Sequence, residues 1–199
     1  TSYFVSESPA VMQTVYGNPI MPWVLFIGLI VMCGFLSARI QKMQASTATG
    51  LYMGLTVLYG ICLAPIFMIY TQASIASTFF ICAATFGAAS VYGMVTKKDL
   101  TGMGQFLMMG LFGVIIAMIV NIFLQSSVMQ TIISMVAVLL FTGLTAYDTQ
   151  KLKSMAVTLP ADASGAMVRK GAILGALSLY LDFMGLFVHL LSLLGIARD

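Results

Sequence analysis

Residues 171–195, GAILGALSLYLDFMGLFVHLLSLLG, are the part of this chain that decides its fold. The stretch is apolar and long enough to cross a bilayer as a helix, because a helix rises about 1.5 Å per residue and the hydrocarbon core is about 30 Å thick. It nevertheless carries an aspartate, Asp182, near its middle. A carboxyl group inside a membrane costs roughly 2.5–3.5 kcal/mol on insertion scales and usually marks a functional site. Asp182 is therefore the first candidate functional residue.

Small and polar residues recur along this stretch at alternating spacings of three and four. That period places them on one face of a helix, with Leu, Phe, Val and Ile on the remainder. Small side chains on one side of a membrane helix indicate the side that meets other helices, because they let backbones approach closely. We therefore expect other helices to surround this one. The face consists of Gly171, Gly175, Ser178, Asp182, Gly185, His189 and Ser192.

The composition assigns the whole chain to the membrane proteins. Of its 199 residues, 60% are hydrophobic and 8% are charged, and the mean hydropathy is +1.03. Soluble domains carry about a quarter charged residues, so a soluble class is excluded. The three cysteines lie singly within apolar stretches and form no metal-binding spacing. We predict one transmembrane helical domain over residues 1–199, with the lipid bilayer as its surroundings and no nucleic acid as a partner.

Apolar stretches alternate with polar turns and predict an all-α bundle of seven spans. Thr1–Val5 look like the last turns of a first helix whose start is absent, and residues 6–22 read as a loop. Pro65 lies within one later span and predicts a kink there. A long polar segment at residues 151–170 separates the last two spans. The six complete spans are expected at about residues 20–38, 50–70, 75–95, 102–124, 128–150 and 171–195.

Lys and Arg are distributed unevenly between the loops. Eight of the nine basic residues lie in three loops, and the three alternate short loops contain none. The positive-inside rule therefore predicts that these three loops face the cytoplasm and that the C-terminus faces away from it. Arg39 lies at the cytoplasmic end of its span, where its long side chain could reach water or a buried carboxylate. The eight residues are Arg39, Lys42, Lys97, Lys98, Lys151, Lys153, Arg169 and Lys170.

A second carboxylate, Asp148, lies near the cytoplasmic end of the span that precedes the last one. Asp182 lies about eleven residues, or roughly 16 Å, from the cytoplasmic start of its own span. Whether the two groups meet depends on how far each helix projects from the membrane. A pair is the less costly arrangement, because two carboxyl groups can share one proton. In the alternative arrangement, Asp148 caps its helix at the water interface and Asp182 stays neutral, bonded to a Ser or a Tyr.

Five segments of the chain resemble the Bax inhibitor-1 family, also called the transmembrane Bax-inhibitor-motif family, and its bacterial members in particular. The most specific of them is SLYLDFMGLFVHLLSLLG at residues 178–195. The resemblance covers nearly the whole chain. The other segments are residues 146–151 (AYDTQK), 97–100 (KKDL), 121–123 (NIF) and 60–66, around the proline.

This resemblance implies a seven-helix bundle with the last helix at its centre. It also implies a pH-sensitive leak for calcium or another cation, in which Asp148 and Asp182 act as gate and metal ligands and Arg39 as a latch. Ser178, His189 and Asn121 are expected to support the pair as further polar groups, although a histidine at such a position more often serves packing. Some bacterial relatives carry an acidic residue in the second helix, and residues 26–35 contain none here.

Three classes of function fit a pair of membrane aspartates. The first is the cation leak, with calcium as the permeant ion and no cofactor. The second is an intramembrane aspartyl protease, but those enzymes share a Gly-x-Gly-Asp motif where residues 179–182 read Leu-Tyr-Leu-Asp, so we expect no enzyme. The third is a non-transporting protein that binds and restrains a membrane protease or another membrane complex. The short polar end after Gly195 favours a bacterial inner membrane.

Overall fold

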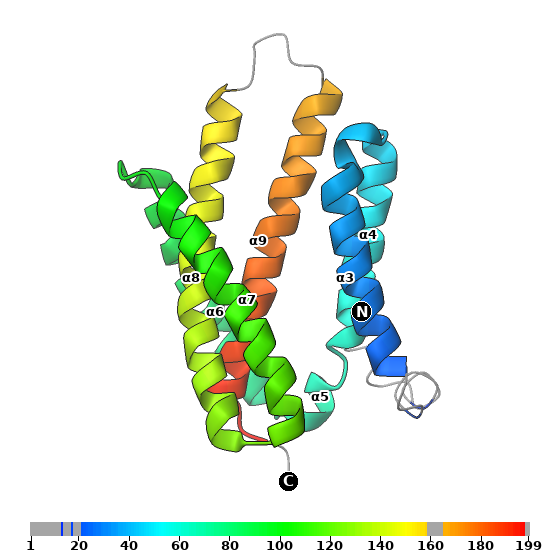
Figure 1. Cartoon of the computed structure of the whole chain (residues 1–199), viewed down its shortest axis with the longest axis vertical. Coiled ribbons are helices and arrows are strands. Elements are labelled where there is room, and N and C mark those ends of the chain that lie inside the picture. The colour runs from blue at the N-terminus through cyan, green and yellow to red at the C-terminus, as the bar shows by residue number, and fades with distance from the viewer. Residues whose placement is uncertain (1–12, 14–16, 18–20, 159–164, 198–199) are drawn as a thin grey trace. The chain divides into compact units, whose positions relative to one another are not determined.

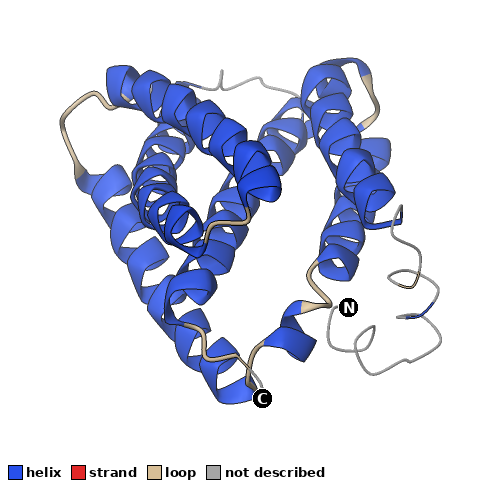
Figure 2. Cartoon of the chain, turned by 60° about the horizontal axis from the view of Figure 1, so that its bottom comes forward, coloured by secondary structure: helices blue, strands red, loops and turns tan. Residues whose placement is uncertain are grey.

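The computed structural model describes residues 13, 17, 21–158 and 165–197 (Figure 1). All regular elements in these residues are helices, and no β-strand occurs among them (Figure 2). Within the described ranges, five helices are long and apolar enough to cross a membrane, and Ile27–Arg39 is a shorter apolar helix. The predicted all-α membrane architecture is therefore confirmed. The expected end of a first helix at Thr1–Val5 lies outside the described residues.

The chain divides into two compact units, of which the first contains its N-terminal helices. Helix α3 (Met21–Arg39) and helix α4 (Ala45–Cys62) are joined by a 3-10 turn, Ile40–Lys42. Helix α4 ends earlier than the predicted span over residues 50–70, and a separate short helix, α5 (Ile66–Ile69), follows it. The break occurs because Pro65 has no N–H to continue the helical hydrogen bonds. The predicted kink is therefore a full interruption of the helix.

The second unit contains helices α6 (Gln72–Val95), α7 (Thr101–Leu124) and α8 (Ser127–Thr158), and helix α9 (Gly165–Leu194) from Gly175 onward. Helices α7 and α8 run side by side (Figure 1) and enclose an apolar core. This core fixes α8 against α7 along several turns. It consists of Leu107, Val114, Ile133, Ala137, Leu140 and Leu144.

Helices α8 and α9 are both longer than the sequence pattern predicts. Helix α8 continues to Thr158 instead of ending near Gln150, and α9 begins at Gly165 instead of Gly171. Much of the expected polar loop is therefore helical. Residues 151–158 contain neither Gly nor Pro, so nothing in them stops a helix after it leaves the apolar region. Hydropathy marks only the part of a helix that lies in lipid.

Within the second unit, α9 contacts α8 and α6 with different faces. The ring of Phe183 packs edge-on against Phe79 and Phe86 of α6, with ring centres 5.7 Å and 5.4 Å away. The Cys82 thiol of α6 donates to the Phe183 carbonyl oxygen at 3.6 Å. The small and polar face of α9 is turned to α8. Of the five candidate spans in the described part of the chain, α9 has the largest buried share.

Candidate functional site

Helices α8 and α9 pack antiparallel through faces of complementary size. A β-carbon at Gly175 would overlap the side chain of Leu152, and one at Gly185 would overlap the ring of Phe141. Large side chains of α8 therefore fill the spaces that the glycines of α9 leave open, and the two backbones approach closely. The predicted small and polar face of α9 is thus an interface with α8 from Gly175 onward.

Asp148 and Asp182 lie in this interface, close enough for their charges to interact. The hydroxyl of Ser178, one turn before Asp182 on α9, is placed to donate a hydrogen bond to the Asp148 carboxyl. Asp182 therefore lies about one turn further along α9 than the level of Asp148. Its side chain is 5% exposed, and its Oδ2 atom has no hydrogen-bond partner among the described residues. The two predicted carboxyl groups thus lie within interaction range of each other, and Ser178 lies beside Asp148.

The carboxylate pair can gain or lose a proton, but ionising both groups at once is energetically unfavourable. A carboxylate removed from water loses hydration that only hydrogen bonds or opposite charges replace. A second carboxylate nearby adds repulsion, so the low-energy state is one in which the pair shares a proton. Losing that proton leaves a negative site inside the helix bundle, which attracts a cation. The arrangement is therefore suited to proton-dependent cation binding.

Lys151 is a charged residue near the pair for which the sequence predicts only a role in membrane orientation. It follows Asp148 by one turn of α8, and the two charges are close enough to attract. Its ammonium group also lies 5.8 Å from the centre of the Tyr147 ring. The i, i+3 spacing from Asp148 is the signal in the sequence that identifies this contact.

Arg39 ends α3 in the first unit, where its side chain is exposed. Its predicted role as a latch for the carboxylates stays a prediction.

His189 belongs to a second polar cluster further along α9. Its Nδ1 atom lies 3.4 Å from the Ser134 hydroxyl of α8, which donates to the Ser192 hydroxyl at 3.2 Å. The imidazole ring stacks on Phe141, with ring centres 6.0 Å apart and planes 24° apart. About 10 Å of helix separate His189 from Asp182, because their positions are seven residues apart and each residue adds about 1.5 Å. The histidine therefore has its own partners and does not touch the carboxylates.

Asn121 lies at the turn between α7 and α8. Its Nδ2 donates to the Gln130 Oε1 atom at 3.3 Å, and its Oδ1 accepts from the Ser126 N–H at 3.2 Å. These bonds hold a turn in which Gln125 adopts the left-handed conformation, with φ 49°. Gln130 and Asp148 are eighteen residues apart on α8, or about 27 Å. The structure does not bring Asn121 to the carboxylate pair.

The oxygens around the pair limit how a metal could be held. Among the described residues, no group of three or more His, Cys, Asp and Glu side chains lies together. Calcium takes six to eight oxygen ligands, and the two aspartates with Ser178 supply only part of that number. A calcium ion at this position would keep several water molecules.

The whole chain, residues 1–199, matches the family described as Inhibitor of apoptosis-promoting Bax1. The "Inner membrane protein YbhL" of Escherichia coli K12 is 44% identical over 99% of this chain and 84% of its own length. "Uncharacterized protein RP147" of Rickettsia prowazekii is 45% identical over 94% of this chain and 76% of its own length. "Uncharacterized protein YrjE" of Lactococcus lactis is 34% identical over 98% of this chain and 80% of its own length.

These similarities confirm two predictions from the sequence. Several apolar helices and an inner-membrane relative agree with the expected multi-pass protein of a bacterial inner membrane. The segment that suggested the family, residues 178–195, is also the one that places Ser178 and Asp182 against α8. The chain belongs to the Bax inhibitor family.

Proposed function

We propose that this protein is a pH-sensitive leak for calcium or another cation, gated by Asp148 and Asp182. One observation carries the proposal: two carboxyl groups interact inside the α8–α9 interface, and one of them is 5% exposed with an oxygen that lacks a partner among the described residues. Ionisable groups in membrane spans commonly mark ion or proton pathways. In this proposal, the chain has seven spans, calcium is the transported ion rather than a cofactor, and no enzymatic step takes place.

Protonation of the pair acts on the path in two opposing ways. It removes the negative charge that attracts a cation, since metal ligands must be deprotonated. It also removes the attraction between Asp148 and Lys151 within α8, which frees the Lys151 side chain at the end of the path. The resemblance to the family implies that acidification increases the leak, which corresponds to the second effect. Both effects depend on the same two carboxyl groups, so the flux must titrate with them.

The test is calcium flux into liposomes that contain the purified protein, measured between about pH 5 and pH 8, the range in which coupled buried carboxyls titrate. The wild-type flux should change across this range, and Asp148→Asn or Asp182→Asn should each flatten the profile. The double variant should do little more than either single one, because interacting groups are not additive.

Asp99→Asn is the matched control for this experiment. Asp99 is exposed in the α6–α7 loop and bonds to Thr101, so its loss should leave the profile unchanged. A wild-type pH profile in Asp182→Asn would refute the gate. A folded protein that carries no flux at any pH would instead favour a non-transporting protein that binds a membrane protease or another membrane complex.

A further inference from the structure

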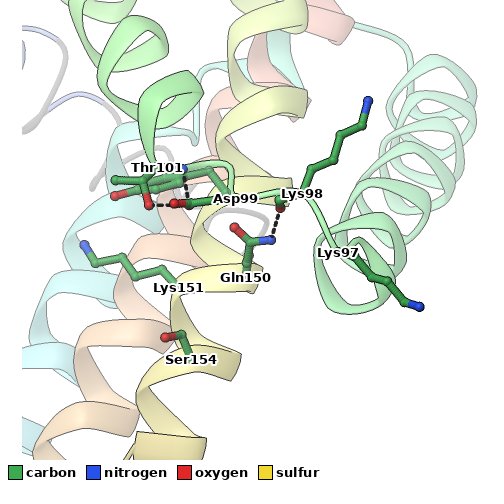
Figure 3. Close-up of a pocket in the computed structure, with 8 residues that line it drawn as sticks. Lys97, Lys98, Asp99, Thr101, Gln150, Lys151 and Ser154 are labelled. Atoms are coloured by element: carbon green, nitrogen blue, oxygen red, sulfur yellow. Dashed lines mark hydrogen bonds between the residues drawn. The ribbon is translucent and has the colours of Figure 1, made fainter.

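A pocket of about 440 Å³ lies where the α6–α7 loop meets the end of α8 (Figure 3). Its volume falls in the range of small-molecule sites, about 300–1,000 Å³. The pocket belongs entirely to the second unit and lies outside the carboxylate pair. The residues that line it include Lys97, Lys98, Thr101, Gln150, Lys151 and Ser154.

The side chain of Gln150 holds the two walls of the pocket together. Its Nε2 donates to the Lys98 carbonyl oxygen at 2.7 Å, and its Oε1 accepts from the Leu100 N–H at 2.9 Å. Nearby, the Lys153 ammonium donates to the Met94 carbonyl oxygen at 2.7 Å. Two hydrogen bonds thus attach the loop to α8, and a third attaches the end of α6 to it, each between groups about fifty residues or more apart in sequence. The walls of the pocket are therefore held in place by long-range hydrogen bonds of the fold.

The charges that line the pocket favour an anion. Three lysines stand against one carboxylate, Asp99, which is already engaged by the Thr101 N–H at 2.9 Å and hydroxyl at 2.6 Å. These two hydrogen bonds lower the pKa of Asp99, because both donors stabilise its ionised form. A net excess of ammonium groups remains beside the hydroxyl of Ser154. Ammonium and hydroxyl donors together are the groups that bind phosphate.

The lysines can approach a bound group from two sides. In Figure 3 the amino groups of Lys97 and Lys98 point away from Gln150, whereas Lys151 extends on the side of Thr101 and Asp99. All three side chains are exposed, so their rotamers exchange rapidly and can close on a ligand. This end of the unit also carries the basic residues that predict the cytoplasmic membrane surface, where phosphate groups of lipids and of soluble anions are both present.

We propose that this pocket binds the phosphate group of an anion, with the ammonium groups of Lys97, Lys98 and Lys151 and the hydroxyl of Ser154 as its donors. This binding does not depend on the proposed leak, because the pocket is formed by the α6–α7 loop with Thr101 and by the end of α8.

Binding is tested on the full chain in detergent by calorimetric titration with two probes. One probe is a short-chain phosphatidylglycerol and the other is inorganic phosphate. Lys151→Gln and the double variant Lys97→Gln/Lys98→Gln should each bind about tenfold more weakly than wild type, the loss expected for one charge-assisted hydrogen bond. Lys42→Gln is the matched control, because it removes the same charge from a basic loop outside the pocket.

The two probes distinguish the source of the phosphate. Binding of the lipid alone, with the expected lysine dependence, assigns the pocket to lipid headgroups. Binding of both probes with that dependence assigns it to phosphate in general. Pocket variants that bind both probes as tightly as Lys42→Gln would overturn the site.

Discussion

The substitution Gly93→Ala tests how closely α6 and α8 approach beside the carboxylate site. A β-carbon built at Gly93 would overlap the backbone carbonyl oxygen of Ala146, two residues before Asp148. A backbone carbonyl belongs to the helical hydrogen-bond ladder and cannot turn aside as a flexible side chain does. The two helices must therefore separate to accept one methyl group.

The expected cost follows from a comparison with Gly87 on the same helix. Apart from its chain neighbours and the backbone of its own helix, no atom of the described residues lies within 4 Å of a β-carbon built at Gly87. Gly87→Ala should therefore be neutral or gain about 0.5–1 kcal/mol from the better helix former. Gly93→Ala gains the same amount of stability from helix propensity but is destabilised by overpacking, which costs about 1–3 kcal/mol in a packed interior. Because the obstacle is backbone, we expect the upper part of this range. The two variants should differ in free energy of unfolding by about 2–3 kcal/mol.

The assay is an unfolding titration with SDS in mixed micelles, followed by circular dichroism. Gly93→Ala should unfold at a lower SDS fraction than both wild type and Gly87→Ala. Equal resistance of the two alanine variants would show that α6 and α8 are not in backbone contact at this level. The packing around Asp148 would then need another explanation.

Three further predictions concern other parts of the chain. A reporter fused after Asp199 should behave as non-cytoplasmic and one inserted near Ser164 as cytoplasmic; the same side for both would contradict the predicted orientation. Gly185→Leu should destabilise the protein by about 1–3 kcal/mol or more, because an aromatic ring of α8 occupies the space, and an SDS titration like that of wild type would argue against this. Thr101→Val should raise the pKa of Asp99 toward its usual value, since the hydroxyl donor is lost; NMR titration of the carboxyl carbon measures this, and an unchanged pKa would contradict it. The lowered pKa stabilises the fold above the unfolded-state pKa of Asp99, and this contribution is lost as the pH falls through the folded-state value.

The long helices could be predicted from the sequence because lipid imposes a simple rule on composition. Five of the six complete predicted spans each correspond to one described helix, whereas residues 50–70 are divided between α4 and α5. Helices α6 and α7 agree with the prediction to within three residues at both ends. The ends of α8 and α9 could not be predicted in this way. Residues 151–158 and 165–170 are helical although polar, and hydropathy does not distinguish a projecting helix from a loop.

The carboxylate pair was predictable from chemistry, and its surroundings only in part. A carboxyl group in the middle of an apolar span stands out by its cost, which identifies Asp182 without a structure. The roles of Lys151 and Gln150 could not be predicted, because the polar segments of the sequence contain several lysines and other polar residues. Only the folded structure shows which of them lie near the pair and the α6–α7 loop. The face of α8 that meets α9 could have been found by the same count that revealed the face of α9. It runs through Ser134, Ala137, Phe141, Thr145, Asp148 and Leu152 at spacings of three and four.

These two faces explain why the carboxylates meet even though their charges repel. Leu152 fits against Gly175 and Phe141 against Gly185, so each large side chain of α8 faces a small residue of α9. Sliding one helix by a turn would place Phe141 against Asp182 or His189 instead of Gly185, and the close approach at that level would be lost.

Steric fit therefore sets the register of the two helices, and that register brings Asp182 within range of Asp148. Asp148→Asn and Asp182→Asn keep the size of the side chain and leave this fit intact. Both variants should fold with α8 and α9 in the same register, and a change in their flux can then be attributed to the loss of an ionisable group. Asp182→Asn also replaces the carboxyl group, whose Oδ2 atom lacks a partner among the described residues, with a neutral amide that does not repel Asp148. The variant should therefore unfold at the same SDS fraction as wild type or at a higher one. A marked loss of stability would mean that the carboxyl attraction through a shared proton, and not packing, holds the interface together.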